Sequence, residues 1–494
     1  MASARRTWLL LGALTLGGAA LRLPFLGLQS LWYDESFTLA VVEQHTLGML
    51  WDQVRLSEST PPLYYAITWA WERLVGDTGD ASLRAPAAIA GVLCVPAAYL
   101  AARRAMGERV ALGAAALTAA SPVMVSYSLD ARAYSLLALL GCLSLWAMSE
   151  ALARRSTSWL AGWALLSAAC LWTHYYAIFL VGAELAVLLW RLRGARLRVA
   201  VAGAAVAASF VPLLSLLADQ HDERASHIES LQLGERVRQA VRQLAAGPNP
   251  PSGALEAIAV LLGAGGLAAG AYLALRGRRE RPGSGPGSAR GHADPRPGLI
   301  AAIAVAALAA PLALAVTGID DHFFMRNLLV AWGALAALAA LGLTRARAIP
   351  LGVALAVGVA LTVATLADWR HQNADWGGAL ARLGPAARGV PVVVLPGFDA
   401  PVADTYLDRP YAHQPLVTRS AWVVVEPGRQ GRTALTESPG LPRALPAGFR
   451  ATTTRRYRGF RMILIEAPRP APLDPAALGK DQLGGPPVVL GPAP

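Results

Sequence analysis

The sequence predicts an all-α polytopic membrane protein with about eleven transmembrane helices, followed by a small C-terminal extracytoplasmic α/β domain. Apolar residues make up 55% of the chain and charged residues only 15%, and the mean hydropathy is +0.42. Apolar runs of roughly 18 to 25 residues, long enough to cross a bilayer core as helices, recur as far as residue 367. After residue 369 the chain changes to short apolar runs separated by Pro and Gly.

The first predicted span, residues 7–27, follows Arg5 and Arg6, as the apolar part of a signal peptide would. No clear small-residue cleavage site follows, so we interpret it as a retained helix. The fifth and sixth spans meet at a short junction, WTHYY (172–176), and either one could be a tilted or re-entrant segment. The predicted spans are 7–27, 83–101, 108–126, 133–151, 158–173, 175–190, 197–217, 253–275, 298–317, 327–343 and 348–367.

The charge of the loops predicts a multi-pass protein of the cell (inner) membrane with a cytoplasmic N-terminus and an extracytoplasmic C-terminal domain. In this orientation the first outer loop, 28–82, is acidic and the inner loops are rich in arginine. These inner loops are 103–109, 153–155, 191–198, 276–298 and 344–347. The net charge of +12 is therefore expected to face the anionic inner leaflet of the lipid bilayer and not nucleic acid.

Two domains are expected from these patterns. The transmembrane domain spans 1–368 and contains a Gly, Pro and Ser-rich cytoplasmic linker, 277–298. The extracytoplasmic α/β domain spans 369–470 and is followed by a loose tail, 471–494. Three apolar runs in it predict buried strands, namely VPVVVLPG (390–397), AWVVVEPG (421–428) and YRGFRMILIEAP (457–468).

Polar and ionisable residues that a membrane protein retains only at a cost gather in the loops of the predicted outer face. Such a cluster indicates a functional site by default. Its members are Asp34, Glu35, Pro61, Pro62, Tyr64, Tyr65, Tyr127, Asp130, Arg132, Tyr134, His174, Tyr175, Tyr176, His221, Asp222, Asp320, Asp321, His322 and Arg326. The three cysteines, Cys94, Cys142 and Cys170, lie inside predicted spans and are expected to pack there.

Several of these stretches resemble the GT-C superfamily of membrane glycosyltransferases, in particular the bacterial branch of family 39, which is similar to protein O-mannosyltransferases. The resemblance covers about the first 190 residues well and the rest loosely. The stretches are LWYDESFTLA (31–40), STPPLYY (59–65), SLRAPAAIAGVLCVPAAYL (82–100), SYSLDARAYSLLALL (126–140), THYYAIFL (173–180) and ADWGGAL (374–380).

The resemblance implies a GT-C fold and a transferase that works at the outer face of the membrane. Such an enzyme moves a sugar, here a mannose-like hexose or a pentose, from a polyprenyl-phosphate carrier to a hydroxyl of an acceptor glycan, lipid or protein, with inversion. This chemistry requires a carboxylate for the acceptor proton, cations for the leaving phosphate and aromatic walls for the sugar.

By this resemblance Asp34 and Glu35 are the catalytic pair, with Asp34 as the general base. Leu31, Trp32 and Phe37 would partly desolvate it. Adjacent helical side chains point about 100° apart, so Glu35 is expected to orient a neighbour, bind a cation or hydrogen-bond the loop. The alternative is that Asp34 is the N-cap of the helix SFTLAVV, with Glu35 in its first turn.

The donor phosphate is assigned to Arg132, His322 and Arg326, since guanidinium groups bind phosphate oxygens bidentately. His322 and Arg326 are four residues apart and are expected to share one helix face. Alternatives are a snorkelling Arg132 and an ordinary polar turn at DDHFFMRN (320–327), in which Asp320 and Asp321 could also ligate a divalent ion. The sugar is assigned to aromatic residues that could equally form an interfacial belt: Tyr64, Tyr65, Tyr134, His174 and Tyr175.

No cofactor and no metal are expected, because no strong ligand spacing is present. A divalent cation stays open as an alternative. Two other classes of protein compete with the transferase. A transporter or lipid flippase would show repeats and mid-membrane polar groups, but the sequence has no repeat, and its one clear carboxylate deep in a span is Glu184. An inactive GT-C scaffold of envelope assembly is the second competitor.

Overall fold

The computed structural model forms two compact units. One consists of Met1–Leu26 and Val41–Val363, and the other of Gly27–Ala40 and Ala364–Pro494. Residues 27–40, which carry the acidic pair, thus belong with the C-terminal part of the chain. The structure describes residues 2–224, 232–251, 253–276, 297–319, 322–345, 349–412, 416–427, 429–430, 434–435, 444–479 and 486–492. The predicted linker lies almost wholly outside these residues.

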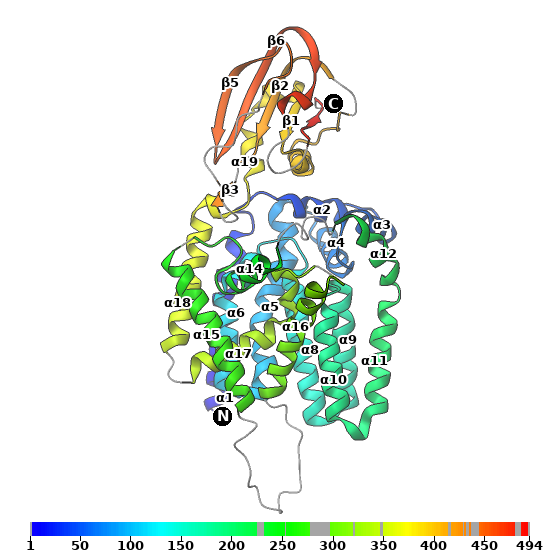
Figure 1. Ribbon diagram of the computed structural model, residues 1–494, viewed down its shortest axis with the longest axis vertical. Coiled ribbons are helices and arrows are strands. Elements are labelled where there is room, and N and C mark those ends of the chain that lie inside the picture. Colours follow the sequence, from blue (N-terminus) through cyan, green and yellow to red (C-terminus); the bar gives the residue numbers. More distant parts are fainter. Residues whose placement is uncertain are drawn as a thin grey trace, which may run out of the picture. The chain divides into compact units, whose positions relative to one another are not determined.

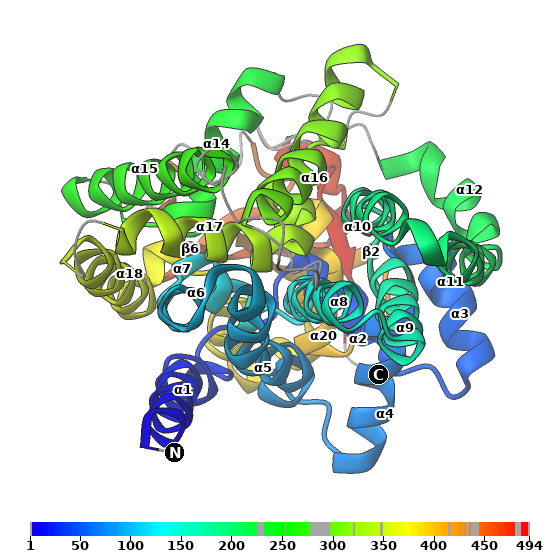
Figure 2. The ribbon, with the colours of Figure 1, turned by 90° about the horizontal axis from the view of Figure 1, so that it is seen from below.

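Helices account for nearly all of the first unit (Figure 1). Looking along the bundle, Figure 2 shows α5 beside α6 and α8, and α15 beside α17. The helices of this unit are α1 (Ala2–Ala20), α3 (Leu47–Ser57), α4 (Leu63–Val75), α5 (Asp80–Met106), α6 (Glu108–Ala120), α7 (Pro122–Ser128), α8 (Tyr134–Arg154), α9 (Thr157–Thr173), α10 (Ala177–Arg191), α11 (Arg196–Phe210), α12 (Leu213–Arg224), α14 (Leu233–Ala246), α15 (Ala254–Arg276), α16 (Pro297–Thr317), the 3₁₀ helix η3 (Met325–Ala331) and α17 (Trp332–Thr344). Two more, α2 (Tyr33–Val42) and α18 (Ile349–Ala367), continue from one unit into the other.

The helices confirm a polytopic membrane protein, with fewer full-length spans than the eleven predicted. Within the described residues, seven helices are long and apolar enough to cross a membrane, or up to nine if each of two bent pairs is one span. The predicted fifth and sixth spans, 158–173 and 175–190, are α9 and α10, which have 17 and 15 residues and are not among the seven. Ser156 caps the start of α9 and His174 ends it, which limits its length.

Prolines explain the two bent pairs. The pair α6 and α7 bends by 54° at Ser121 and Pro122. Pro122 has no N–H to continue the helix, and the Ser121 hydroxyl accepts from Met124 N–H to start α7. The pair α11 and α12 bends by 52° next to Pro212.

Small residues and one buried arginine hold the helices together. A Cβ on Gly270 of α15 would lie 1.8 Å from the Leu338 carbonyl oxygen of α17, so only glycine permits this approach. Arg22, after α1, is fully buried. Its guanidinium donates to the carbonyls of Gly18, Ala119 and Thr118 and to the Ser128 hydroxyl, which satisfies a charge that would otherwise be costly.

The second unit contains a five-stranded sheet in the order β5-β6-β2-β1-β7. Its strands are β1 (Val392–Leu395), β2 (Leu416–Val425), β5 (Arg450–Tyr457), β6 (Phe460–Leu473) and β7 (Val488–Leu490), and β3 (Arg429–Gln430) pairs separately with β4 (Ala434–Leu435). The strands β1, β2 and β6 confirm the three predicted apolar runs. The pair β1 and β2 is parallel, and the other pairs in the large sheet are antiparallel.

Two short helices make this unit α/β, namely α19 (Trp376–Ala381) and α20 (Ala400–Leu407). Trp376 packs edge-on against Phe460 of β6, with ring centroids 5.0 Å apart, in the apolar core of the unit. The segment 471–494, for which the sequence predicts a loose tail, supplies the end of β6 and the edge strand β7. The VVL run of β7 does not alternate between apolar and polar residues, but it is apolar enough to be buried on the sheet.

Candidate active site

The acidic pair lies in the first turn of α2. The helix begins at Tyr33, and the Trp32 carbonyl accepts from the N–H groups of Glu35 and Ser36 at 2.9 and 3.0 Å. Asp34 is therefore inside the helix, and the alternative that it is the N-cap is wrong. Its side chain is half-buried. A carboxylate in a first helical turn is favoured by the exposed N–H groups and the helix dipole.

Glu35 has a different environment from Asp34. Its side chain is fully buried, and one carboxylate oxygen, Oε2, accepts from the Trp32 backbone N–H at 3.3 Å. This is the reciprocal half of a capping box, in which the third helical residue reaches back to the residue before the helix. Of the roles expected for Glu35, the structure shows the hydrogen bond to the loop.

Arg132, in the first unit, forms a buried ion pair with Glu58. Its two terminal nitrogens donate to the two carboxylate oxygens of Glu58, each at 2.8 Å. The two side chains are only 7% and 2% exposed. The guanidinium carbon lies 5.8 Å from the ring centroid of Tyr65, whose hydroxyl is 2.8 Å from the Thr60 hydroxyl. Burial raises the pKa of Tyr65, although the Arg132 charge opposes this, so the phenol stays protonated.

Arg326 lies over two aromatic rings beside this pair. Its guanidinium carbon is 5.6 Å from the ring centroid of Tyr134 and 5.3 Å from that of Phe324. The Tyr134 ring is 5.0 Å from that of Tyr127 and 6.2 Å from that of His174. Arg326, at the start of η3, is thus brought to the tyrosine that begins α8.

His174 is held neutral inside this cluster. Burial and the charges of Arg326 and Arg132 lower its pKa to about 3, against a hydrogen bond with Asn327. The backbone N–H of Tyr176 donates to Nδ1 at 3.2 Å, which leaves the proton on Nε2. The charges of both arginines therefore act near His174, which itself adds no charge.

The other predicted sugar and phosphate ligands are more dispersed. Tyr64 is buried edge-on against Tyr65, and the Tyr175 hydroxyl donates to Gln220 of α12 at 2.9 Å. His322 precedes η3 in extended chain, because Phe324 at the N-cap is itself extended, so His322 and Arg326 do not share a helix face as predicted. The His322 carbonyl accepts from the Asn327 side chain at 2.9 Å.

No metal-ligand cluster is found in the part of the chain that the structure describes. There, no group of three or more His, Cys, Asp or Glu side chains could hold an ion. Asp320 and Asp321, and the side chains of His221 and Asp222, lie outside the described residues. Cys94, Cys142 and Cys170 are free, buried thiols inside the bundle.

Sequence reasoning missed Glu58 and Asn327. Glu58 directly precedes STPPLYY (59–65) in the acidic loop 28–82. The signal available was physical, because an arginine buried in the protein needs a carboxylate partner. Asn327 follows Arg326 and was absorbed into a predicted helix, although Asn favours side-chain bonds to nearby backbone.

Comparisons with known proteins give one family match over part of the chain and several likenesses of fold. The sequence model of a family described as dolichyl-phosphate-mannose-protein mannosyltransferase matches residues 59–216, which include Glu58's neighbours Thr60 and Tyr65 as well as Arg132 and His174. No curated protein sequence matches the chain.

Among solved structures, the apo form of ArnT from Cupriavidus metallidurans has 14% sequence identity and a TM-score of 0.57, and the match covers 94% of this chain and 98% of that chain. ArnT bound to undecaprenyl phosphate matches at 18% identity over 81% of this chain and 74% of that chain, with a TM-score of 0.46. An oligosaccharyltransferase from Archaeoglobus fulgidus, in complex with Zn and sulfate, matches at 16% identity over 76% and 55%, with a TM-score of 0.48. The likeness to apo ArnT, over nearly the whole of both chains, is one of fold.

Proposed function

We propose that this chain, which has the fold of the GT-C membrane glycosyltransferases, transfers a sugar from a polyprenyl-phosphate carrier to an acceptor hydroxyl. The sugar is a mannose-like hexose or a pentose, and the acceptor is a glycan, lipid or protein. The family that matches residues 59–216 is described by a sugar donor of this lipid-phosphate class. Transfer occurs at the outer face of the membrane, where the carrier's tail stays in the bilayer.

One observation carries this proposal. The Tyr134 ring lies 6.2 Å from the ring of buried His174 and 5.6 Å from the Arg326 guanidinium carbon, and the charges of Arg326 and Arg132, from segments almost two hundred residues apart, both lower the pKa of His174. Cations beside aromatic faces are what a sugar phosphate requires, because guanidinium N–H groups bind phosphate oxygens and ring faces pack against a sugar. In a partly desolvated site these interactions are stronger than in water.

The reaction is a single displacement. Asp34 takes the proton of the acceptor hydroxyl while the acceptor oxygen forms a bond to the anomeric carbon. The bond between that carbon and the phosphate oxygen breaks, and its electron pair leaves with the polyprenyl phosphate. Attack opposite the leaving group inverts the anomeric configuration. Arg132 and Arg326 stabilise the negative charge on the departing phosphate, and His322 is assigned to the same group.

The remaining residues have supporting parts in this proposal. Glu58 fixes the plane of the Arg132 guanidinium by accepting from both terminal nitrogens. Neutral His174 and Tyr134 wall the sugar without adding a competing charge. The buried phenol of Tyr65 supports Arg132, and Tyr64 packs edge-on against Tyr65; Tyr64 and Tyr175 are assigned to the sugar by the resemblance. Glu35 holds the start of α2, so that Asp34 alone of the pair is the base.

The test is purification of the wild type and of Asp34→Asn, followed by transfer assays with a panel of polyprenyl-phosphate sugars and membrane-derived acceptors. Asn is nearly isosteric with Asp but cannot accept the proton. We expect kcat to fall by roughly two orders of magnitude or more, with unchanged thermal stability. Equal activity in both proteins would remove Asp34 from the mechanism, and no transfer from any donor would favour a transporter or an inactive scaffold.

A further inference from the structure

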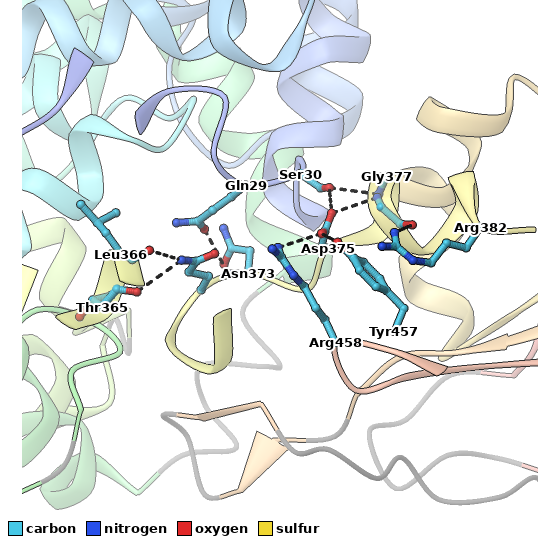
Figure 3. A network of polar contacts seen from close by, with 12 residues as sticks. Gln29, Ser30, Thr365, Leu366, Asn373, Asp375, Gly377, Arg382, Tyr457 and Arg458 are labelled. Atoms are coloured by element: carbon cyan, nitrogen blue, oxygen red, sulfur yellow. Dashed lines mark hydrogen bonds and ion pairs between the residues drawn. The ribbon is translucent and has the colours of Figure 1, made fainter. Parts of the chain in front are cut away.

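The stretch ADWGG (374–378), which opens the sheet-containing unit, is built around the carboxylate of Asp375 (Figure 3). Its Oδ1 accepts from the Ser30 hydroxyl at 2.7 Å and from the Gly378 N–H at 3.0 Å, which caps α19. Its Oδ2 accepts from the Tyr457 hydroxyl and from Arg458 at 3.0 Å, both at the β5–β6 turn. Burial opposes ionisation, but these bonds and the Arg458 charge keep the pKa of Asp375 below its usual range.

Three consecutive residues before α2 are each held by this unit. Gln29 accepts from the Asn373 N–H at 3.1 Å, and the Ser30 hydroxyl also accepts from the Gly377 N–H at 3.0 Å. The Leu31 N–H donates to the Tyr406 hydroxyl of α20 at 2.7 Å. One residue into α2, the Tyr33 ring packs edge-on against Phe398, with ring centroids 5.7 Å apart.

The two glycines of ADWGG are what this close approach requires. A Cβ on Gly377 would lie 3.0 Å from the Tyr406 ring and 3.1 Å from the Ser30 hydroxyl. A Cβ on Gly378 would lie 2.6 Å from the Asp375 carboxylate and 2.7 Å from Tyr457. Any side chain at either position would push residues 29–31 away or break the bonds to Asp375.

We propose that the ADWGG stretch and Tyr406 form a clamp that sets the position of Asp34, which makes Asp375 and Tyr406 positioning residues for the transfer. This inference rests on the proposed function. The clamp ends at Leu31, and the capping bond between Trp32 and Glu35 continues from there to the turn that carries Asp34. Residues 29 to 33 and Glu35 thus each have a described contact that fixes the backbone or the start of the helix around Asp34. A base displaced by about 1 Å loses roughly a hundredfold in rate.

The variants for the test remove single hydroxyls. Tyr406→Phe deletes the acceptor for the Leu31 N–H, and Ser30→Ala deletes both hydroxyl bonds of Ser30. Ser30→Thr retains a hydroxyl and should restore activity. The matched control is Thr405→Val, one residue before Tyr406 in α20, which removes only the bond from Thr405 to the Pro401 carbonyl.

Two readouts separate positioning from simple stability. The first is hydrogen–deuterium exchange of the peptide covering residues 28–40, and the second is kcat and KM for the donor. We expect faster exchange in Tyr406→Phe and Ser30→Ala, with kcat lowered about tenfold in each and about a hundredfold in the double variant, and donor KM within about twofold. Ser30→Thr and Thr405→Val should match the wild type in both readouts.

Unchanged kcat in the double variant would overturn the inference, whether or not exchange is faster. A parallel rise in donor KM with unchanged kcat would overturn it as well, because Asp34 is not assigned to the donor. If the wild type transfers no sugar, the proposed function fails. Exchange alone then decides whether the clamp holds residues 28–40, and unchanged exchange in both single variants would refute the clamp itself.

Discussion

Replacing Glu58 by alanine would leave the Arg132 guanidinium buried without the carboxylate that accepts from both of its terminal nitrogens. The side chains are 7% and 2% exposed, so water cannot replace the lost partner without opening the structure. Breaking a buried pair by removing one partner costs about 3 to 5 kcal/mol, because an uncompensated charge remains. For a chain of this length that corresponds to a fall in Tm of roughly 3 to 10 °C.

A double-mutant cycle measures the coupling free energy between Glu58 and Arg132. Glu58→Ala, Arg132→Ala and the double variant are compared with the wild type by thermal unfolding in detergent. Since the double variant removes both charges, it should be less destabilised than the sum of the single variants, with a coupling of about 2 kcal/mol or more. Glu235→Ala in α14 is a matched control, because its ion-pair partner Arg238 is 69% exposed, and this variant should change Tm far less than Glu58→Ala does.

Additive single effects, or a loss below about 1 kcal/mol in Glu58→Ala, would refute the reasoning. Either result would mean that solvent or other groups compensate Arg132 when Glu58 is absent. Activity adds a separate observation: Glu58→Ala should lower kcat more than it lowers the folded fraction, since Glu58 orients Arg132 toward the leaving phosphate.

Three further predictions concern other groups. Arg326→Gln should raise the donor KM about 10- to 100-fold, because it removes one charge-assisted contact with the phosphate. The control Arg238→Gln should leave the donor KM unchanged. Equal KM values in the wild type and Arg326→Gln would remove Arg326 from the donor site. Burial and the Asp77 charge raise the pKa of Glu72 from 4.5 to about 7. The folded protein thus holds this proton more tightly than the unfolded chain, and ionisation of Glu72 costs stability as pH rises from about 4.5 through 7. Glu72→Gln should therefore raise Tm at pH 8 and leave it unchanged at pH 4, and an equal difference at both pH values would contradict this. The expectation that no metal is used, because the sequence has no strong ligand spacing, predicts that dialysis against EDTA leaves transfer unchanged; a loss that a divalent cation restores would contradict it.

Hydrophobic length and local pattern were enough to predict most elements from the sequence. Each predicted span corresponds to a helix or a bent pair, and the apolar runs VVVL and WVVV became β1 and β2. The bounds of α9 and α10 differ from the predicted 158–173 and 175–190 by at most two residues, since Ser156 caps the start of α9 and His174 ends it. The edge strand β7 was missed because its pairing with β1 depends on a partner about a hundred residues away.

For the candidate site, residue type was easier to predict than partnership. Arg132, Tyr134, His174 and Arg326 do lie together, yet the acid that pairs with Arg132 came from an unremarked loop position, Glu58. The N-cap of α2 is Trp32, two residues before Asp34, which places Asp34 inside the helix. His322 and Arg326 were expected to share a helix face, but they do not, because the backbone at Phe324 is extended and the helix begins only after it.

The bond from Ser30 to Asp375 also bears on how the protein is made, because it joins residues 345 positions apart. The ribosome completes residues 29–31 early, whereas their hydrogen-bond partners, Asn373, Asp375, Gly377 and Tyr406, are among the last part of the chain to be synthesised. During most of synthesis the segment that carries Asp34 therefore lacks its anchors, although the helices around Arg132 already exist. Fixing this segment is a late event in biogenesis, and a chain that stops before residue 364 would insert its helices but never secure its acidic turn.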